Sequence, residues 1–420
     1  MNLTQLQKEY HELFYVEDKA LFPLLIAITI GAKLNAPPVW IYIIGPSSGG
    51  KSTVMSVLNK VPFITALSDL TTNTFLSGAK ATGKETSLLK KLGNNFVITM
   101  KDFTTMISKD DASKGPIIAQ MREIYDGHIV KATGNGDYIE WGSKEKPNKG
   151  TFIMAATEGI YKIQSEFADM GTRAINYVFV PQDRKKTARA ALTNKRNHNK
   201  SADKLGEIQK HVAEFILDKI LNAPEEFPLI DKELEEEIID VADLASMCRS
   251  VVDRDYKGEV NLALSAEFPM RMAEQLLAIA QFMTYANDGV LTNDMKNTIY
   301  KTAFDSIPKQ RRIVLEVLAS YQMIDVIAAG MKINYPSELV RKWVEDLHMF
   351  GIVDRERVKG KEFWKIRDEY RQTLIKYLGI TIHNESLESD ERGEIKRDGP
   401  TWEDKQQEIE LQQAFDNDFK

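Results

Sequence analysis

The chain has 420 residues, of which 43% are hydrophobic and 28% charged, and its formal net charge is -6 at pH 7. This length is too great for a single hydrophobic core and predicts two or three domains with appendages. The single cysteine, Cys248, excludes an intramolecular disulfide framework and a zinc site built from several cysteines, and it fits a reducing, cytoplasmic setting.

The acidic residues are concentrated toward the carboxyl end. Residues 384–420 contain 12 acidic and 5 basic side chains, a net charge of -7, which leaves +1 for residues 1–383. Residues 1–383 are nearly neutral overall, but their basic side chains can still gather into patches that bind a polyanion. The overall negative charge therefore does not exclude DNA as a partner.

Residues 4–34 alternate apolar and polar positions at helical spacing and predict a helical lead-in over residues 1–35. The longest apolar run, residues 21–32, covers about three helical turns, whereas a membrane span needs ~20 residues. It is therefore expected to be a core helix. Glu17 and Asp18 precede this run, and a basic amino-terminal region is lacking, so neither a signal peptide nor a membrane partner is expected.

The most informative motif lies at residues 41–53, where an apolar strand leads into Gly45, Gly50, Lys51 and Ser52 at the spacing G-x-x-x-x-G-K-[ST]. A strand, a glycine-rich turn and a helix start direct backbone N–H groups and a helix dipole toward phosphates. Lys51 is then expected on the β and γ phosphates of ATP and the Ser52 hydroxyl on Mg²⁺. The full set of expected nucleotide contacts is Gly45, Pro46, Ser47, Ser48, Gly49, Gly50, Lys51, Ser52 and Thr53. The alternative is an ordinary glycine-rich turn.

From residue 36 to 183, strands alternate with helices. Strands are predicted at 40–44, 96–100 and 151–156, with helices at 52–58, 86–92 and 117–125 and an unassigned segment at 63–70. This alternation is typical of an α/β fold with a parallel sheet in three layers. Between the last helix and the last strand, residues 127–141 predict a β-hairpin around a Gly134-Asn135-Gly136 turn.

Two polar residues follow the predicted strands. Asp102 comes after strand 96–100, in the position where P-loop ATPases carry a metal-side carboxylate. Because it is the only acid there, the group that activates water stays unassigned; Asp102 could itself be that base, or merely cap the next helix. Thr157 follows strand 151–156 and is a candidate sensor of the γ-phosphate, or else its hydroxyl satisfies a strand-end turn.

Across residues 36–370 the chain resembles the AAA+ ATPases, and among them the viral and mobile-element helicases of superfamily 3 and the minichromosome maintenance helicases. The resemblance implies that the 127–141 hairpin grips DNA, with Lys131 and Asn135 as contacts. It also implies that Arg173, in the stretch 169–177, is an arginine finger for the neighbouring subunit's nucleotide. The alternative is that Arg173 pairs with Asp169 inside its own domain.

Residues 184–307 are predicted to be wholly helical and would form the lid of such an ATPase. Arg271, directly after Pro269 and Met270 at a helix start, would contact phosphate, and Arg249 is a weaker alternative. A basic connector at residues 195–200 opens this region. It is expected to be an exposed loop, and a solvated linker is favoured over a binding site.

Residues 308–375 resemble a winged helix-turn-helix, with helices at 309–320, 323–329 and 336–350 and a hairpin at 352–366. In DNA binders the third helix enters the major groove; in other proteins such units hold proteins together. The side chains expected on DNA phosphates are Lys332, Arg341, Lys342, Arg355, Arg357, Lys359 and Lys361. Residues 376–420 are expected to form an acidic, partly disordered tail, which offers a replication protein the aromatic anchors Phe415 and Phe419.

These features predict an ATP-driven motor that forms a hexameric ring and acts on single-stranded or forked DNA. A replicative helicase or initiator ATPase of a phage or mobile element is the main hypothesis. One alternative is an ATPase that loads another helicase. Another, from a different class, is a nucleotide-gated DNA-binding switch in which the irregular acid motif means weak hydrolysis.

Overall fold

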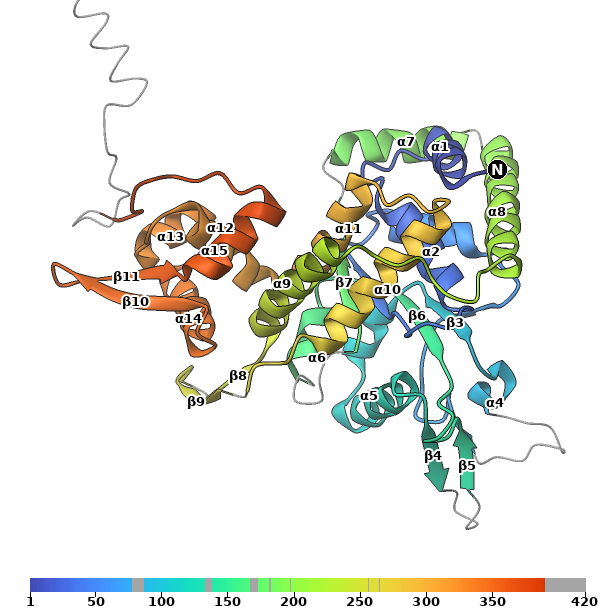
Figure 1. Ribbon diagram of the computed structural model, residues 1–420, viewed down its shortest axis with the longest axis horizontal. Coiled ribbons are helices and arrows are strands. Elements are labelled where there is room, and N and C mark those ends of the chain that lie inside the picture. Colours follow the sequence, from blue (N-terminus) through green and yellow to red (C-terminus); the bar gives the residue numbers. More distant parts are fainter. Residues whose placement is uncertain are drawn as a thin grey trace, which may run out of the picture. The chain divides into compact units, whose positions relative to one another are not determined.

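The computed structural model describes residues 1–77, 87–132, 138–166, 173–180, 183–196, 198–255, 257–263 and 265–389. The chain divides into two compact units, Met1–Pro308 and Lys309–Lys420 (Figure 1). The predicted lead-in, ATPase core and lid all fall within the first unit. The predicted winged helix and tail fall within the second.

The first unit is built on a parallel sheet of five strands in the order β2, β3, β6, β1, β7. These are Ile64–Leu67, Phe96–Met100, Gly150–Ala156, Ile41–Ile44 and Ile175–Val178. Strands β1, β3 and β6 are buried along their whole length, because helices cover both faces of a parallel sheet. This explains their continuous apolar runs and confirms the three predicted strands; β2 lies in the segment left unassigned by sequence.

Helices pack around this sheet (Figure 1). The amino-terminal half contributes α1 (Leu3–Leu13), α2 (Leu21–Gly31), α3 (Lys51–Met55), η1 (Ser56–Leu58), α4 (Leu88–Leu92), η2 (Phe103–Ser108), α5 (Asp111–Tyr125) and α6 (Ile160–Glu166). The rest are α7 (Arg184–Arg196), α8 (His198–Leu221), α9 (Lys232–Arg249), α10 (Met270–Ala286) and α11 (Asn293–Asp305). Together with the sheet they give a mixed α/β unit compatible with the predicted three layers.

Helix α2 is buried throughout, as its apolar run predicted. It packs against α10 so closely that a Cβ on Gly31 would lie 2.3 Å from the Phe282 ring. Glycine is therefore required at this helix crossing. No helix in the described part of the chain is long and apolar enough to cross a membrane.

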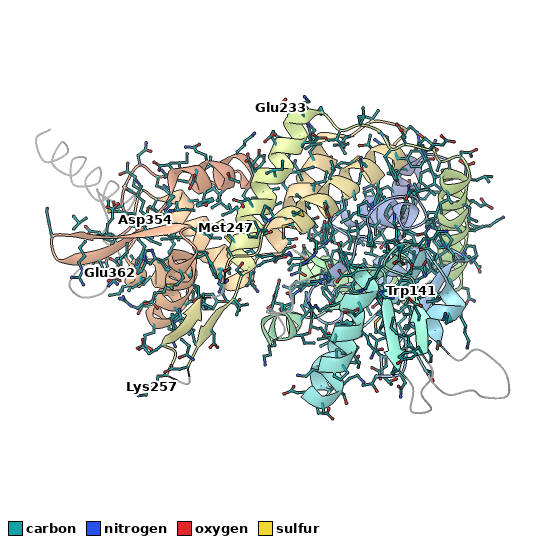
Figure 2. The ribbon with its side chains drawn as sticks, turned by 60° about the horizontal axis from the view of Figure 1, so that its bottom comes forward. Trp141, Glu233, Met247, Lys257, Asp354 and Glu362 are labelled. Carbon is teal, nitrogen blue, oxygen red and sulfur yellow. The ribbon has the colours of Figure 1, made fainter. Side chains whose placement is uncertain are left out.

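The hairpin predicted at 127–141 is confirmed. Strands β4 (Ile129–Ala132) and β5 (Tyr138–Trp141) pair antiparallel, and the Trp141 indole N–H donates to the carbonyl of Gly93 at 2.7 Å (Figure 2). The turn, with Asn135, lies outside the described residues. The hairpin is thus joined at its base to the segment that follows α4.

The prediction that residues 184–307 are wholly helical is wrong at one place. Strands β8 (Val252–Arg254) and β9 (Val260–Ala263) form a second hairpin, with Lys257 in its turn (Figure 2). Its turn is fixed by Asp255, whose carboxylate accepts the N–H groups of Lys257 (2.8 Å) and Glu259 (2.9 Å). Strands of three and four residues are too short to give a clear alternating pattern.

The prediction of an exposed loop at residues 195–200 is also wrong. Lys195 and Arg196 end α7, and residues 198–200 begin α8. Lysine and arginine have good helix propensity, and a basic last turn suits the helix dipole. The asparagines had suggested a loop, but helical neighbours on both sides override that local preference.

The second unit contains α12 (Lys309–Ser320), α13 (Val326–Ile333), α14 (Ser337–Met349), β10 (Val353–Val358), β11 (Lys361–Ile366) and α15 (Asp368–Leu378). The first and third predicted helices and the hairpin form where they were predicted, but the second helix, predicted at 323–329, begins only at Val326, because Asp325 caps it and Ile324 forms a β-bridge with Trp364. Strands β10 and β11 pair antiparallel through a two-residue turn, Lys359 and Gly360, with φ values of 50° and 80°. Positive φ at both positions is typical of the tight hairpin turn that matches strand twist.

The predicted boundary of the tail at residue 376 falls inside α15. Beyond α15 the chain returns to the second unit, where Leu387 and Ser389 are buried. Asp325 accepts the Ser389 N–H at 2.6 Å and pairs with Lys361 at 2.7 Å, while its Oδ1 caps α13. The first residues of the expected tail are therefore part of this unit's core.

Candidate active site

The carboxyl ends of three neighbouring strands lead to one cavity of about 670 Å³ in the first unit. Strand β1 is followed by the glycine-rich loop, residues 45–50; β3 is followed by Asp102, and β6 by Thr157. In a parallel sheet these ends lie at the same edge, and Ile44 pairs with Ala156 in register. Residues separated by up to 112 positions in sequence are thereby brought to one place.

Two glycines give the loop its shape. A Cβ on Gly45 would lie 2.1 Å from the carbonyl oxygen of Phe179, so no side chain fits there. Gly50 has φ +96° and is the N-cap of α3, a conformation that side chains rarely adopt. The loop therefore requires glycine at two of the positions that the motif specifies.

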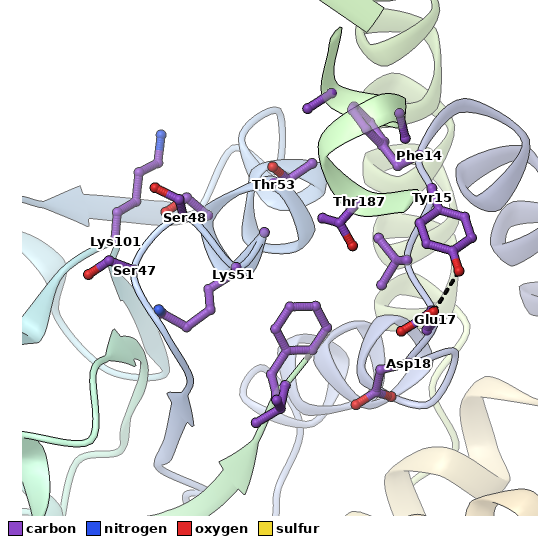
Figure 3. A pocket seen from close by; sticks show the side chains of 18 of the residues that line it. Phe14, Tyr15, Glu17, Asp18, Ser47, Ser48, Lys51, Thr53, Lys101 and Thr187 are labelled. Carbon is purple, nitrogen blue, oxygen red and sulfur yellow. Dashed lines mark hydrogen bonds between the residues drawn. The ribbon is translucent and has the colours of Figure 1, made fainter. Parts of the chain in front are cut away.

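Lys51 is the first residue of α3, and its side chain turns back under the loop (Figure 3). It is only 8% exposed, and its ammonium donates to the carbonyl oxygens of Gly45 and Pro46, both at 2.7 Å. Burial lowers the pKa of Lys51, and the nearby Asp102 carboxylate opposes that shift. A buried cation whose hydrogen bonds to described residues go to two carbonyl oxygens is well suited to an anionic partner.

Asp102 is linked to Thr157 through Thr104. The Asp102 carboxylate accepts the Thr104 N–H at 2.9 Å, which caps η2, and the Thr104 hydroxyl accepts the Thr157 N–H at 3.0 Å. A capping role and a metal-binding role for Asp102 are therefore compatible, because its carboxylate caps a helix while the residue also lines the cavity. Thr157 likewise lines the cavity and is held in place by its neighbour.

A divalent cation would find oxygen ligands here. The Ser52 hydroxyl and the Asp102 carboxylate both line the cavity, and Mg²⁺ prefers oxygen ligands with waters and phosphates completing its shell. Within the described residues no group of three or more His, Cys, Asp or Glu side chains could hold a metal by itself. The donor set fits Mg²⁺ that arrives with a nucleotide.

The opposite wall of the cavity was not predicted from the sequence. It consists of residues 14–18, between α1 and α2, together with one face of α7 and the end of β7 (Figure 3). Glu17 accepts hydrogen bonds from the Tyr15 hydroxyl (2.5 Å) and the Asp183 N–H (3.1 Å). Asn194 of α7 donates to the carbonyl of Leu13 at 3.1 Å. The only sequence signal for this wall was the break between two helical patterns.

Arg173 and Arg271 do not line this cavity. Arg173 pairs with Asp126 and is 11% exposed, and the side chain of Gln275 donates to the Arg173 carbonyl at 3.0 Å. Arg271 pairs with Glu267 at 3.4 Å, and burial together with the nearby Arg173 lowers the pKa of Arg271.

Glu267 also pairs with Arg249, at 2.7 Å. Asp169, the alternative partner of Arg173, lies outside the described residues. The structure thus brings the two expected phosphate-binding arginines to each other rather than to the glycine-rich loop.

Lys131, the expected DNA contact on the first hairpin, is engaged within the protein. Its ammonium donates to the carbonyls of Thr72 (3.2 Å) and Leu76 (3.1 Å) and to the side chain of Asn73 (2.7 Å). An ammonium has three donors, so all of them have partners here. Lys131 ties the hairpin to residues 72–76.

The basic residues of the second unit that were expected on DNA differ in exposure, and three of them form ion pairs with carboxylates of this unit. Lys332, Arg357 and Lys359 are exposed, and Lys342 is half-buried on α14. Arg341 and Arg355 both pair with Glu362, which lies on β11 (Figure 2), and Lys361 pairs with Asp325. The ion pairs neutralise part of the positive charge that the sequence had assigned to DNA.

The cavity therefore combines a buried cation and oxygen ligands at one end with a wall at the other that carries aromatic and aliphatic side chains together with the carboxylates of Glu17 and Asp18. This arrangement suits a molecule with a polyphosphate group, a metal ion and a planar base. No protein-family model and no curated protein sequence matches the chain.

Proposed function

We propose that the protein is an AAA+ ATPase that binds and hydrolyses Mg²⁺-ATP and uses it to move along DNA as a ring. Within that group we favour a helicase or initiator similar to superfamily 3 and the minichromosome maintenance helicases, from a phage or mobile element. The observation that carries the proposal is the gathering of Lys51, Ser52, Asp102 and Thr157 around one cavity.

In this proposal the phosphates lie on the glycine-rich loop. Lys51 exchanges its two carbonyl partners for the β and γ phosphates, a favourable exchange because charge–charge contacts are stronger than charge–dipole ones. Ser52 and Asp102 hold Mg²⁺, and Thr157 lies beside the γ-phosphate. The base and ribose occupy the side formed by residues 14–18 and α7.

Ring assembly is proposed because Arg173 lies away from its own cavity. Acting on a neighbouring subunit, it would leave Asp126 and neutralise charge on the transferred phosphoryl group. Arg271 lies close enough to Arg173 for their two positive charges to interact, so both would reach the same neighbouring nucleotide. Arg271 is then a contact made across the interface, not within the subunit.

DNA is proposed to contact the β4–β5 hairpin and the second unit, which we take to be a winged helix. Exposed Lys332, Arg357 and Lys359 are available there for phosphates. The acidic tail remains a proposed docking segment for a replication protein. The loading of another helicase stays an alternative use of the same ATPase.

One observation favours a second candidate, a nucleotide-gated DNA-binding switch with weak hydrolysis. Among the described residues that line the cavity, Asp102 is the only one with a carboxylate beside the glycine-rich loop; Glu17 and Asp18 line the opposite wall (Figure 3). Glu17 already accepts from Tyr15, and Asp18 accepts from the Tyr177 hydroxyl at 2.7 Å. A second acid to activate water is not among the lining residues on the phosphate side.

ATP turnover with and without single-stranded DNA distinguishes the two candidates. The motor requires turnover that DNA stimulates strongly, whereas the switch requires tight nucleotide binding with little turnover in either condition. Lys51→Ala is expected to abolish nucleotide binding, and Lys90→Ala, an exposed lysine of α4, serves as its control. Normal nucleotide binding by the Lys51 variant would contradict both candidates.

A further inference from the structure

Helix α7 has an unusual charge pattern for a helix that covers a cavity. Its 13 residues include six basic side chains and no acidic one, and no residue of the helix is buried. The basic residues are Arg184, Lys185, Lys186, Arg189, Lys195 and Arg196. The sequence had suggested a solvated linker for the end of this stretch, but here it is a helix with two distinct faces.

The inner face of α7 lines the nucleotide cavity through Thr187, Ala190, Ala191 and Asn194. With 3.6 residues per turn, the positions directly opposite are 185, 189, 192 and 196. These are Lys185, Arg189, Leu192 and Arg196, all exposed. We call the three cations among them the outer stripe of α7.

The charges of this helix are arranged unfavourably for an isolated protein. Arg184, Lys185 and Lys186 occupy the first turn, at the positive end of the helix dipole, and Lys185 and Arg189 are like charges four residues apart. Each such arrangement costs roughly a few tenths of a kcal/mol. Asp183 offsets part of this cost, since it accepts the Lys186 N–H at 2.8 Å and pairs with the Lys186 ammonium at 3.6 Å.

The cations of the outer stripe differ from Lys186 in this respect. Within the described part of the chain, no carboxylate forms an ion pair with Lys185, Arg189 or Arg196. Lys185 and Arg196, at the two ends of the stripe, are separated by 11 residue steps of helix, or roughly 16 Å. A single phosphate is too small to satisfy cations spread over that distance, whereas a polyanion is long enough.

We propose that the outer stripe of α7 binds the phosphate backbone of nucleic acid. A nucleic-acid strand carries one negative charge at each nucleotide, which matches a row of cations without acids among them. The acidic end of the chain is a poorer match, because residues 390–420 mix 10 acidic with 5 basic side chains. Backbone contact of this kind carries no sequence preference.

Because of the position of α7, a contact on its outer stripe is coupled to the nucleotide cavity. One helix has nucleic acid on one face and the nucleotide cavity on the other, and Asn194 joins it to Leu13, the residue that precedes Phe14 of the cavity wall. A shift of α7 that favours one ligand changes the site for the other, and such coupling is reciprocal. The backbone contact stands by itself, whereas its coupling to ATP rests on the proposed function.

The test compares the full chain with a triple variant, Lys185→Gln, Arg189→Gln and Arg196→Gln, since glutamine keeps helix propensity. The matched control removes three charges from other helices, through Lys210→Gln, Lys232→Gln and Lys296→Gln. Binding of a fluorescent 30-nucleotide oligothymidylate is measured across a salt series without nucleotide. Circular dichroism checks that each variant is folded, and basal ATP turnover is measured alongside.

The outer-stripe variant is expected to bind the oligonucleotide about tenfold more weakly at low salt, because three phosphate contacts are lost. For the same reason, the slope of log K against log[salt] should be less negative by up to about 2. Its basal turnover is expected to be unchanged. Equal affinities for wild type and variant, an equal loss in the control, or no oligonucleotide binding by wild type would each overturn the backbone contact.

Two further outcomes separate the possible failures. If a labelled peptide of residues 390–420 binds wild type but not the variant, while oligonucleotide affinity is unchanged, the stripe serves the acidic tail and the proposal is wrong. If wild type lacks ATP turnover but the oligonucleotide result holds, the backbone contact stands and the proposed function fails. If the outer-stripe variant loses DNA-stimulated turnover and the control variant keeps it, the result supports the coupling between the two faces of α7.

Discussion

Arg173 holds Asp126 at two points, Nε to Oδ1 at 3.3 Å and Nη2 to Oδ2 at 3.0 Å. Such two-point contacts between guanidinium and carboxylate are the strongest form of this ion pair. Arg173 is 11% exposed, whereas the Asp126 side chain is 53% exposed. Arg173 is therefore held by an accessible carboxylate, and another anion could displace that carboxylate and bind the arginine in its place.

The first prediction concerns this pair. Arg173→Ala is expected to abolish DNA-stimulated turnover without loss of nucleotide binding, because its proposed target is the neighbouring subunit's nucleotide. Mixing it with Lys51→Ala protein should recover part of the activity at interfaces that combine an intact loop with an intact arginine. No recovery at any mixing ratio would place Arg173 in a role within its own subunit.

The second prediction concerns Asp102. Asp102→Asn keeps an oxygen that can accept the Thr104 N–H, so the cap of η2 and the fold should be preserved. Loss of the charge is expected to reduce ATP turnover at least about a hundredfold while nucleotide affinity changes little, since transition-state charge is what the metal site stabilises. Turnover and affinity are measured on the same preparation; wild-type turnover would exclude Asp102 from the metal site.

The third prediction concerns the glycine-rich loop. Gly45→Ala places a methyl group against the Phe179 carbonyl and is expected to cost roughly 1–3 kcal/mol in unfolding free energy and to weaken ATP binding. Gly206→Ala, in the interior of α8, is the matched control, because its Cβ meets only the end of the Lys60 side chain at 3.4 Å. It should stabilise the protein by up to about 1 kcal/mol. Denaturant unfolding measures both.

The fourth prediction concerns Lys131. Because its three donors are used within the protein, Lys131→Ala is expected to cost roughly 1–3 kcal/mol of stability. Basal and DNA-stimulated turnover should then fall by the same factor. Loss of a residue that contacts DNA would instead reduce DNA-stimulated turnover alone. Lys146→Ala, on the exposed segment after β5, should change stability by less than about 0.5 kcal/mol. A loss confined to DNA-stimulated turnover would restore the DNA role.

The fifth prediction concerns pH and Asp325. Burial would raise the pKa of Asp325, but hydrogen bonds from Lys361, Ala328 and Ser389 lower it below its usual 3.8. A depressed pKa means that the folded form gains stability above pH ~4, which is lost as the pH falls below that value. Asp325→Asn should destabilise the protein at pH 7 and have a smaller effect near pH 3. Asp354→Asn, at an exposed pair with Arg367, provides the control.

Features that depend on a short stretch of chain were predictable. The buried strands β1, β3 and β6 give apolar runs, and the required glycines at 45 and 50 follow from backbone geometry within one loop. The β4–β5 hairpin and three helices of the second unit, α12, α13 and α14, were predicted for the same reason, whereas α15 was not. Periodicity and turn chemistry report local structure, so the sequence by itself determined where these elements form and that glycine is needed at two positions of the loop after β1.

Features that depend on distant partners were decided only by the tertiary structure. Lys131 meets residues 55 to 59 positions away, and Arg173 meets Asp126 at a separation of 47. Residues 14–18 and α7 become a cavity wall because α1, α2 and the sheet pack together. A side chain's charge is visible in sequence, but whether that charge is neutralised, buried or exposed depends on which remote groups the fold places beside it.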